Sequence, residues 1–470
     1  MKYPYEFQQQ DVPLLELALA ILMLGSFFND LLLILIYDVQ IDLTEKSQMI
    51  FSTAFIILFM IKCQKMRLTI YLLIPAYITL IISKYWSHQS YFMVFLGLLF
   101  QIGYVSLVMV MPQYRYPKPT GKYLVGFREV KLQNGDLVSI YYPTLKKSKI
   151  RSINSCRNRD YIKQVYNDFQ HVMHWRPPIM FIYWMLGFLN KVKVEDIEVD
   201  SPIIEGKLPT IVFSNGLGGL KDHYSVFYKE WASNGYQVYS IQQQEVTIIL
   251  NEKEIHQYKI GEATLENQLG QQILSKVKMI RHQQLNDRVT KFQSLLDYVY
   301  KQQNVDFNKV IGAGHSFGAA TVHRSAQIDN RISAGIILFD PWFLPFSEDT
   351  LNIKLSVPLL SVNSETFRLR KENETPQRYS VVFNAQQKKL VIMIKGSQHL
   401  CTTDLVYKMP FELKMFTKLN NLNKILQITI AHLRLSQYFM DSLSPQKTLT
   451  RFEEFSKESF RQPIHEIEYK

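Results

Sequence analysis

The sequence predicts an α/β fold, in which helices cover both faces of a mostly parallel sheet, preceded by an apolar helical region. Two observations carry this prediction. Short continuous apolar runs alternate with helical stretches from Thr210 onward, and four apolar segments precede residue 112. Short apolar runs are typical of strands that are buried on both faces, because helices then cover the sheet on either side.

The four apolar segments cover residues 14–37, 49–61, 68–83 and 91–111. About 20 apolar residues span the hydrocarbon core of a bilayer, and the fourth segment has 21 residues without a charge. The alternative is that all four are buried helices of a globular domain, but they lack the charged face that such helices carry. We therefore predict a transmembrane helical region over residues 1–111.

The stretches that flank these segments differ in their basic residues, which mark the cytosolic side of membrane proteins. Lysine and arginine concentrate between the second and third segments and after the fourth. With four spans, both stretches lie on the same side as the remainder of the chain. We therefore predict a multi-pass integral membrane protein, with the bilayer as a partner and the catalytic domain on the cytosolic side.

Composition limits the other partners. The chain has 470 residues and a formal net charge of +12, which suits nucleic acid or an anionic membrane surface. It contains no basic run interleaved with aromatic residues, so we expect no nucleic-acid partner. The cysteines Cys63, Cys156 and Cys401 form no CxxC pair, so we expect neither a disulfide framework nor a cysteine zinc site. We expect no metal and no other cofactor.

After the apolar region, the chain is expected to open with a hairpin and to continue as a parallel sheet. Alternating apolar residues flank Asn134-Gly135, and an Asn-Gly pair favours the positive φ angles of a tight turn. Helix is expected in the second half of the Gln-rich segment 245–302. The runs that we interpret as buried strands cover residues 210–215, 236–241, 309–314, 334–340, 357–364 and 390–396.

The motif Gly314-His315-Ser316-Phe317-Gly318 joins one of these runs to a helical pattern. A serine between two glycines at such a boundary is the nucleophile elbow of the α/β-hydrolase fold. The turn is so tight that Gly314 and Gly318 must be small, and it exposes the Ser316 hydroxyl above the carboxyl edge of the sheet. His315 is expected to pack within the elbow. The alternative is an ordinary glycine-rich turn.

A serine hydroxyl needs a base to take its proton, and in this fold an acid and then a histidine follow the serine. Asp340 ends an apolar run, which places it at the carboxyl edge, whereas Asp329 and Asp349 lie in polar contexts. His399 follows the last run after a short turn, while the two later histidines lie in a helical pattern and in the tail. We therefore predict a catalytic triad of Ser316, Asp340 and His399.

A triad of this kind also needs two N–H donors for an oxyanion. One is the N–H of the residue after the nucleophile, Phe317. The glycine-rich loop after the run 210–215 supplies the other, for which we choose Leu217. The rival interpretation is a phosphate-binding loop, but Lys221 occupies the place of the third glycine in GxGxxG, and no GK[ST] follows.

Four segments resemble the platelet-activating factor acetylhydrolases of the plasma, lipoprotein-associated type and their intracellular, isoform II-like relatives: VFSNGLGGLKDHYS, VIGAGHSFGAATV, GIILFDPWFLP and IKGSQH. The likeness extends with gaps over residues 117–442. It implies a calcium-independent serine esterase that removes short or oxidised acyl chains from the sn-2 position of a phospholipid substrate. It also implies the triad Ser316, Asp340 and His399 and the oxyanion donors Leu217 and Phe317.

The sequence departs from that family at two places near the expected site. Asn215 stands where the family usually has histidine, and residues 242–245 read Gln-Gln-Gln-Glu where it usually has Glu-His-Arg-Asp. We assign residues 112–445 to a catalytic domain and 446–470 to a charged tail. A lipase or carboxylesterase for other acyl esters would share every catalytic residue. A catalytically inactive membrane scaffold is the non-enzymatic alternative, against which the intact triad argues.

Overall fold

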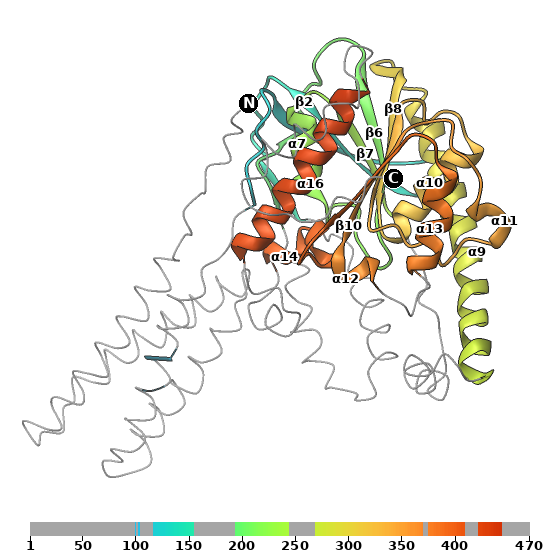
Figure 1. Cartoon of the computed structure of the whole chain (residues 1–470). Helices are drawn as coiled ribbons and strands as arrows, with labels where there is room; N and C mark the ends of the chain where they lie inside the picture. Colours follow the sequence, from blue (N-terminus) through green and yellow to red (C-terminus); the bar gives the residue numbers. More distant parts are fainter. Residues whose placement is uncertain are drawn as a thin grey trace, which may run out of the picture.

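The structure is a computed structural model of the whole chain, and it describes residues 99, 102–103, 116–154, 193–243, 268–369, 375–408 and 422–443. Within these ranges, a central sheet is covered by helices on both faces (Figure 1). The predicted α/β architecture is confirmed for this part of the chain.

The central sheet has nine strands in the order β11-β10-β9-β8-β6-β7-β2-β1-β5. The pairs formed by β2 with β1 and with β7 are antiparallel, and all other pairs are parallel. Its strands are β1 (Leu124–Lys131), β2 (Leu137–Thr144), β5 (Glu198–Val199), β6 (Leu208–Ser214), β7 (Gln237–Ile241), β8 (Val305–His315), β9 (Gly335–Phe339), β10 (Leu359–Ser364) and β11 (Lys389–Ile394). The short strands β3 (Ser152–Asn154) and β4 (Lys193–Glu195) form a separate two-stranded sheet.

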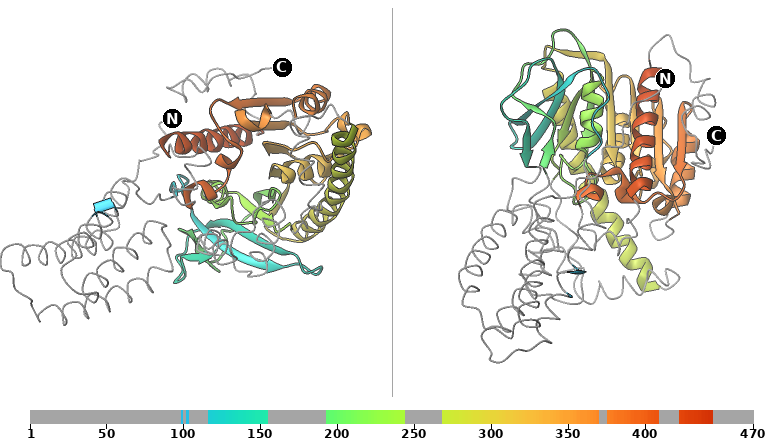
Figure 2. Two further views of the ribbon diagram at one scale, coloured as in Figure 1. Left: turned by 90° about the horizontal axis from the view of Figure 1, so that it is seen from below. Right: turned by 90° about the vertical axis from the view of Figure 1, so that its left-hand side faces the viewer.

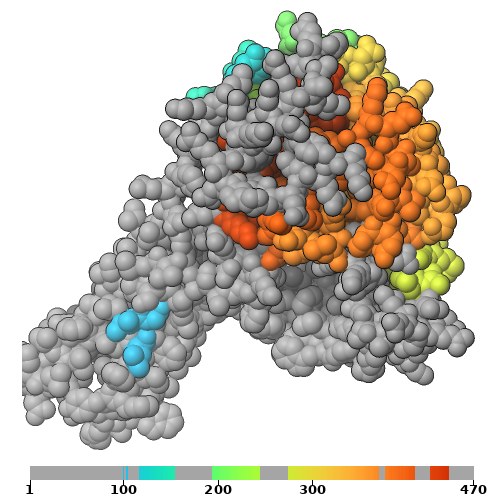
Figure 3. Space-filling model, in the orientation of Figure 1, coloured from blue at the N-terminus to red at the C-terminus, as the bar shows by residue number. Residues whose placement is uncertain are grey.

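Five longer helices cover the sheet, two on one face and three on the other (Figure 2). The first face is covered by α7 (Ser225–Ser233) and α16 (Leu422–Ser442), and the second by α9 (Gln268–Val299), α10 (Phe317–Ile328) and α13 (Thr375–Ala385). The short elements α11 (Glu348–Leu351), α12 (Glu365–Arg368), η3 (His399–Thr402) and α14 (Leu405–Lys408) follow strands or lie in connections. The segment from β10 to α14 forms much of the orange surface in Figure 3.

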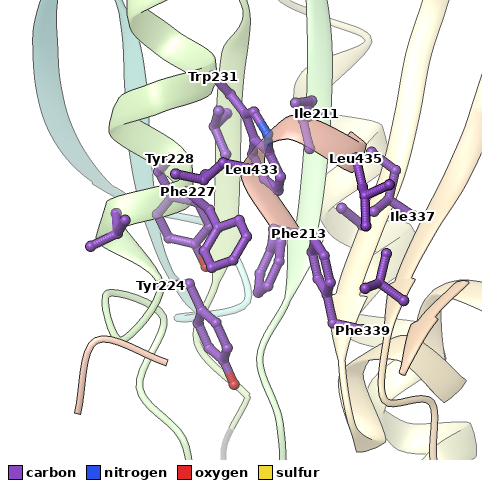
Figure 4. Close-up of a cluster of buried hydrophobic side chains, with 14 of the residues drawn as sticks. Ile211, Phe213, Tyr224, Phe227, Tyr228, Trp231, Ile337, Phe339, Leu433 and Leu435 are labelled. Atoms are coloured by element: carbon purple, nitrogen blue, oxygen red, sulfur yellow. The ribbon is translucent and has the colours of Figure 1, made fainter. Parts of the chain in front are cut away.

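Successive strand residues enter opposite layers of the core, as the two-residue repeat of a strand requires. Ile211 and Phe213 of β6 point toward α7 and α16, whereas Val212 packs on the opposite side. In the first layer, aromatic rings of α7 pack on the sheet, with the ring centres of Phe213 and Tyr228 5.0 Å apart (Figure 4). Both faces of the strands are therefore buried, which explains their continuous apolar sequence.

The predicted hairpin is present, since β1 and β2 pair along their whole length. Gly135 has a φ of 89°, a value that glycine adopts without steric cost. The six predicted strand runs correspond to β6 through β11, and the helix expected before the elbow is α9. The small strands β3, β4 and β5 have no counterpart in our prediction, because two or three residues are too few to show periodicity.

The order of β7, β6 and β8 determines where a ligand site forms. The chain passes from β6 to β7 on one side and then returns to β8 on the other. Connections that leave in opposite directions open a crevice at the carboxyl ends of such neighbouring strands. This is the edge next to α12 and α14, at the bottom of the sheet in Figure 1.

The prediction of a multi-pass integral membrane protein with a cytosolic catalytic domain was wrong. Among the described residues, no helix is both long enough and apolar enough to cross a bilayer. The longest two, α9 and α16, have sufficient length but carry charged side chains along them, such as Lys276, Arg281 and Arg434. The segments on which that prediction rested, within residues 14–111, lie outside the described residues apart from 99, 102 and 103.

Candidate active site

Ser316 lies between the end of β8 and the start of α10, in a strained backbone conformation with a φ of 56°. The glycines around it are required by close backbone contacts. A Cβ atom on Gly314 would lie 2.5 Å from the carbonyl oxygen of Gly318, and one on Gly318 would lie 2.0 Å from the carbonyl oxygen of Ser214. The Ser316 N–H donates to Phe339 O at 2.9 Å, which ties the turn to the neighbouring strand β9.

Three side chains from different loops meet at this edge of the sheet. His399 Nε2 lies 3.1 Å from Ser316 Oγ, and His399 Nδ1 lies 3.0 Å from Asp340 Oδ2. Ser316 follows β8, Asp340 follows β9, and His399 begins η3 after β11. The structure therefore brings the three predicted triad residues into one continuous chain of hydrogen bonds.

Asp340 is buried, with a relative exposure of 1%. Burial alone raises the pKa of this carboxyl group, but its interactions with His399, followed by those with His315 and the Ser364 hydroxyl, outweigh burial and leave the pKa below its ordinary value. The Ser364 N–H donates to Oδ1 and the Ser364 hydroxyl to Oδ2. Asp340 is thus a carboxylate that accepts a hydrogen bond from His399 Nδ1–H.

Two other rings contact the ring of His399. Phe367 of α12 stacks on it, with ring centres 4.1 Å apart and an angle of 11° between the planes. The centre of the His315 ring lies 4.5 Å from the centre of the His399 ring, with an angle of 34° between the two planes. These contacts fix the imidazole in the plane that joins Ser316 to Asp340.

His315 has a tautomer that its partners determine. Its Nε2 lies 3.2 Å from the carbonyl oxygen of His399, which can only accept, so Nε2 carries the proton. Burial and the nearby His399 hold the pKa of His315 well below its ordinary value, so the ring is neutral and Nδ1 accepts. The donor to Nδ1 is the Tyr224 hydroxyl at 2.9 Å, whose oxygen accepts from the Gly216 N–H at 3.0 Å. His315 is therefore a structural link between η3 and the loop after β6.

The two predicted oxyanion donors come from the start of α10 and from the loop after β6. Phe317 is the first residue of α10, and the first N–H groups of a helix have no partner within that helix. Leu217 lies in the loop after β6 and is 38% exposed. A Cβ atom on its neighbour Gly216 would lie 3.3 Å from Ser316 Cβ, which is tighter than an ordinary van der Waals contact, so this loop lies close to the serine.

The two departures from the family sequence both contact this loop. The Asn215 amide donates to Gly216 O at 3.0 Å and to Gly219 O at 2.8 Å, and its oxygen accepts from the Gln243 N–H at 3.1 Å. Gln242 donates to Gly219 O at 3.2 Å. Residues 244 and 245 lie outside the described part of the chain. The substituted residues thus form hydrogen bonds that hold the loop in place.

Over residues 108–301 and 250–452, the chain matches the family described as platelet-activating factor acetylhydrolase, isoform II. The chain belongs to this family. As a platelet-activating factor acetylhydrolase homologue, it is a carboxylic ester hydrolase of the serine-hydrolase type.

Individual members of the family are similar over most of the catalytic region. The platelet-activating factor acetylhydrolase of Cavia porcellus is 27% identical over 322 residues, which cover 62% of this chain and 69% of the relative. That of Canis lupus familiaris is 25% identical over 63% of this chain and 69% of the relative. A ferulic acid esterase from Streptomyces cinnamoneus superposes with a TM-score of 0.47 and 15% identity, over 71% of this chain and 94% of that structure, which is too distant to support an argument.

The side-chain atoms that could bind a metal ion at this site already form hydrogen bonds to one another or to neighbouring groups. His315, Asp340 and His399 offer ligand atoms within 4.8 Å of one another, and this is the sole such group in the described part of the chain. Their atoms are engaged in the hydrogen bonds described above, including both ring nitrogens of His315 and of His399. The absence of a metal stays a prediction.

Sequence reasoning missed two residues that shape the site. Tyr224 lies on the entry to α7 and joins His315 to Gly216, and Arg288 of α9 reaches the loop after β6. Arg288 ends the segment IRHQQLNDR, which lies within the part of the chain that matches the family. Nothing in the sequence indicated which side chain of that segment points toward the site.

Proposed function

We propose that this enzyme hydrolyses the sn-2 ester of glycerophospholipids that carry a short or oxidised acyl chain, without calcium, through an acyl-enzyme on Ser316. The observation that carries the proposal is the chain of hydrogen bonds from Ser316 Oγ through His399 to Asp340, at 3.1 and 3.0 Å. The names of the family and of its relatives support the class of substrate.

Each step of the reaction has a group of this chain to perform it. Ser316 Oγ attacks the ester carbonyl carbon while its proton moves to His399 Nε2, and Asp340 stabilises the imidazolium. The Leu217 and Phe317 N–H groups bind the oxyanion. The C–O bond to the glycerol then breaks, and the leaving alkoxide takes the proton from His399. A water molecule, deprotonated by His399, releases the fatty acid from Ser316 by the same steps.

Calcium independence follows from the same assignment of roles. The base is an imidazole, and the charge on the oxygen is stabilised by backbone N–H groups, so no step depends on a cation. We propose that residues 112–445 form this catalytic unit and that 446–470 form a charged tail, since the nine-stranded sheet and the helices that cover it lie between residues 124 and 442.

The test uses the purified full-length protein and a fluorophosphonate probe, which reacts with an activated serine. We expect rapid labelling that is lost in Ser316→Ala and retained in Ser294→Ala, a control on the exposed side of α9. Labelling that survives in Ser316→Ala would overturn the assignment of the nucleophile.

The substrate class is tested by turnover in the presence of a calcium chelator. We expect hydrolysis of 2-acetyl and oxidised phospholipids at a higher kcat/KM than long-chain phospholipids and neutral esters. A preference for neutral esters would replace the proposal by a lipase or carboxylesterase, and activity that requires calcium would contradict the mechanism.

A further inference from the structure

We propose that Arg288 is a positioning residue for the oxyanion hole, acting on both of its N–H donors. The inference rests on the proposed function, because it concerns the same site. Arg288 lies on α9, outside the elbow and the loop after β6, and it is buried with a relative exposure of 2%.

The first effect of Arg288 is on the peptide unit that joins Gly216 to Leu217. Gly216 O accepts from three donors: Asn215 Nδ2 at 3.0 Å, the Gly219 N–H at 3.0 Å and Arg288 Nη2 at 3.4 Å. In a trans peptide the C=O and the following N–H point in opposite directions. Holding Gly216 O toward Arg288 therefore turns the Leu217 N–H away from Arg288, which fixes the direction of this predicted oxyanion donor.

The adjacent peptide is held in the same way. Arg288 Nη1 donates to Asn215 O at 2.8 Å, and the Gly216 N–H of that peptide donates to the Tyr224 hydroxyl at 3.0 Å. The guanidinium therefore binds the carbonyl oxygens of the two peptide units that flank Gly216, Asn215 O and Gly216 O, and fixes the orientation of both. Donors fixed before the reaction need no reorganisation when the negative charge develops, which is the main source of their effect on rate.

The second effect is on the donor at the elbow. The guanidinium carbon of Arg288 lies 4.5 Å from the centre of the Phe317 ring, within the range of a cation–π contact. Phe317 is fully buried, and Trp342 packs edge-on against it with ring centres 5.4 Å apart. One side chain therefore contacts both the loop with Leu217 and the residue that supplies the other N–H.

Lysine cannot reproduce this arrangement. The guanidinium is planar and presents several N–H groups at fixed angles, so it binds two carbonyl oxygens and stacks on a ring at once, whereas an ammonium is a compact point charge. Arg288→Lys keeps the positive charge but loses the planar set of N–H donors. Arg288→Met keeps a side chain of similar length but loses both the charge and the donors.

Arg378 supplies a matched control. It is also buried, and its Nη1 donates to two carbonyl oxygens, Phe343 O at 3.2 Å and Phe346 O at 3.0 Å, without a hydrogen bond to the loop after β6 among those described. Arg378→Lys should therefore lower stability in a comparable way while leaving the oxyanion donors in place.

The experiment measures kcat and KM for a short-chain ester, and hydrogen exchange of peptides covering residues 213–220, on the full-length variants. We expect Arg288→Lys and Arg288→Met to lower kcat by about 10- to 100-fold, with KM within about 3-fold, because the lost interaction acts in the transition state. Exchange in this loop should become faster in both. Arg378→Lys should keep the kcat and the exchange of the parent enzyme.

Three results would overturn the inference: kcat within about 3-fold of the parent in a folded Arg288 variant, unchanged exchange of the loop, or an equal loss in Arg378→Lys. If neither Arg288 variant folds, Asn215→Ala removes one donor to Gly216 O and must give the same pattern. If the parent enzyme hydrolyses no ester, the proposed function fails, but the exchange experiment still decides whether Arg288 holds the loop.

Discussion

The Tyr224 hydroxyl is the hydrogen-bond partner of two buried groups, for which the described residues offer no second partner. It accepts from the Gly216 N–H at 3.0 Å and donates to His315 Nδ1 at 2.9 Å. The ring of Tyr224 is buried, with a relative exposure of 2%. Tyr224→Phe removes the oxygen and keeps the ring, so it isolates the contribution of these two hydrogen bonds.

The expected loss of stability follows from the two groups left behind. A buried donor or acceptor without a partner costs about 1–3 kcal/mol, so the orphaned Gly216 N–H and His315 Nδ1 together cost about 2–6 kcal/mol. His315 cannot change its tautomer to avoid this cost, because its Nε2 proton is bound to His399 O. The free energy of unfolding is measured by urea denaturation followed by tryptophan fluorescence.

Tyr228→Phe is the control, four residues further along the chain on α7 and in the same aromatic cluster (Figure 4). The Tyr228 hydroxyl lies 3.0 Å from Ser240 Oγ, and the Ser240 hydroxyl already donates to Lys221 O at 2.9 Å. Its removal leaves no donor unpaired, so we expect a loss of only about 0.5–1.5 kcal/mol. Equal losses in the two variants would refute the argument from unpaired groups.

Three further predictions concern other buried positions. His323 has both ring nitrogens buried without a hydrogen-bond partner among the described residues. Burial, followed by the charge of Arg324, lowers its pKa to about 3, so the protein loses stability as pH falls below about 6.5, by about 2 kcal/mol at pH 5. In His323→Phe, urea midpoints measured across this range should lose that part of their pH dependence. In Gly318→Ala, a Cβ atom 2.0 Å from Ser214 O should abolish fluorophosphonate labelling, and a variant that still labels would contradict the described elbow. Ser364→Ala removes a donor at 2.6 Å from Asp340, so the pKa of that carboxyl should rise and kcat should fall on the order of tenfold without a matching change in KM; an unchanged kcat would show that the hydroxyl is dispensable.

The sequence was sufficient for the strands and for the residues at their carboxyl ends. Parallel strands end at one edge of a sheet, so a polar residue directly after an apolar run is placed without knowledge of the packing. Ser316 and Asp340 follow β8 and β9 in this way, and His399 follows β11 after four intervening residues. The order of the strands brings these loops together in space. Knowledge of that order was not needed to select Ser316, Asp340 and His399.

The supporting contacts lay beyond the sequence, because they depend on which side chain of a long helix points inward. α9 has 32 residues, many of them polar, and only the packed structure shows that Arg288 faces the loop after β6. The membrane prediction failed for a different reason. It was based on apolar composition before residue 112, where the structure describes residues 99, 102 and 103, and no described helix is both long enough and apolar enough to cross a bilayer.

The strands that carry the nucleophile and the base differ in the number of neighbours with which they pair. Ser316 stands at the end of β8, which has neighbours on both sides, whereas His399 depends on β11, the outermost strand, which pairs with β10 alone in the described sheet. Outer strands open more readily than inner ones, because fewer hydrogen bonds must break. Mild heating or dilute denaturant would thus displace the His399 imidazole while the backbone turn at Ser316 stays intact. Hydrolysis would then stop before the protein unfolds as a whole, and it would resume on cooling.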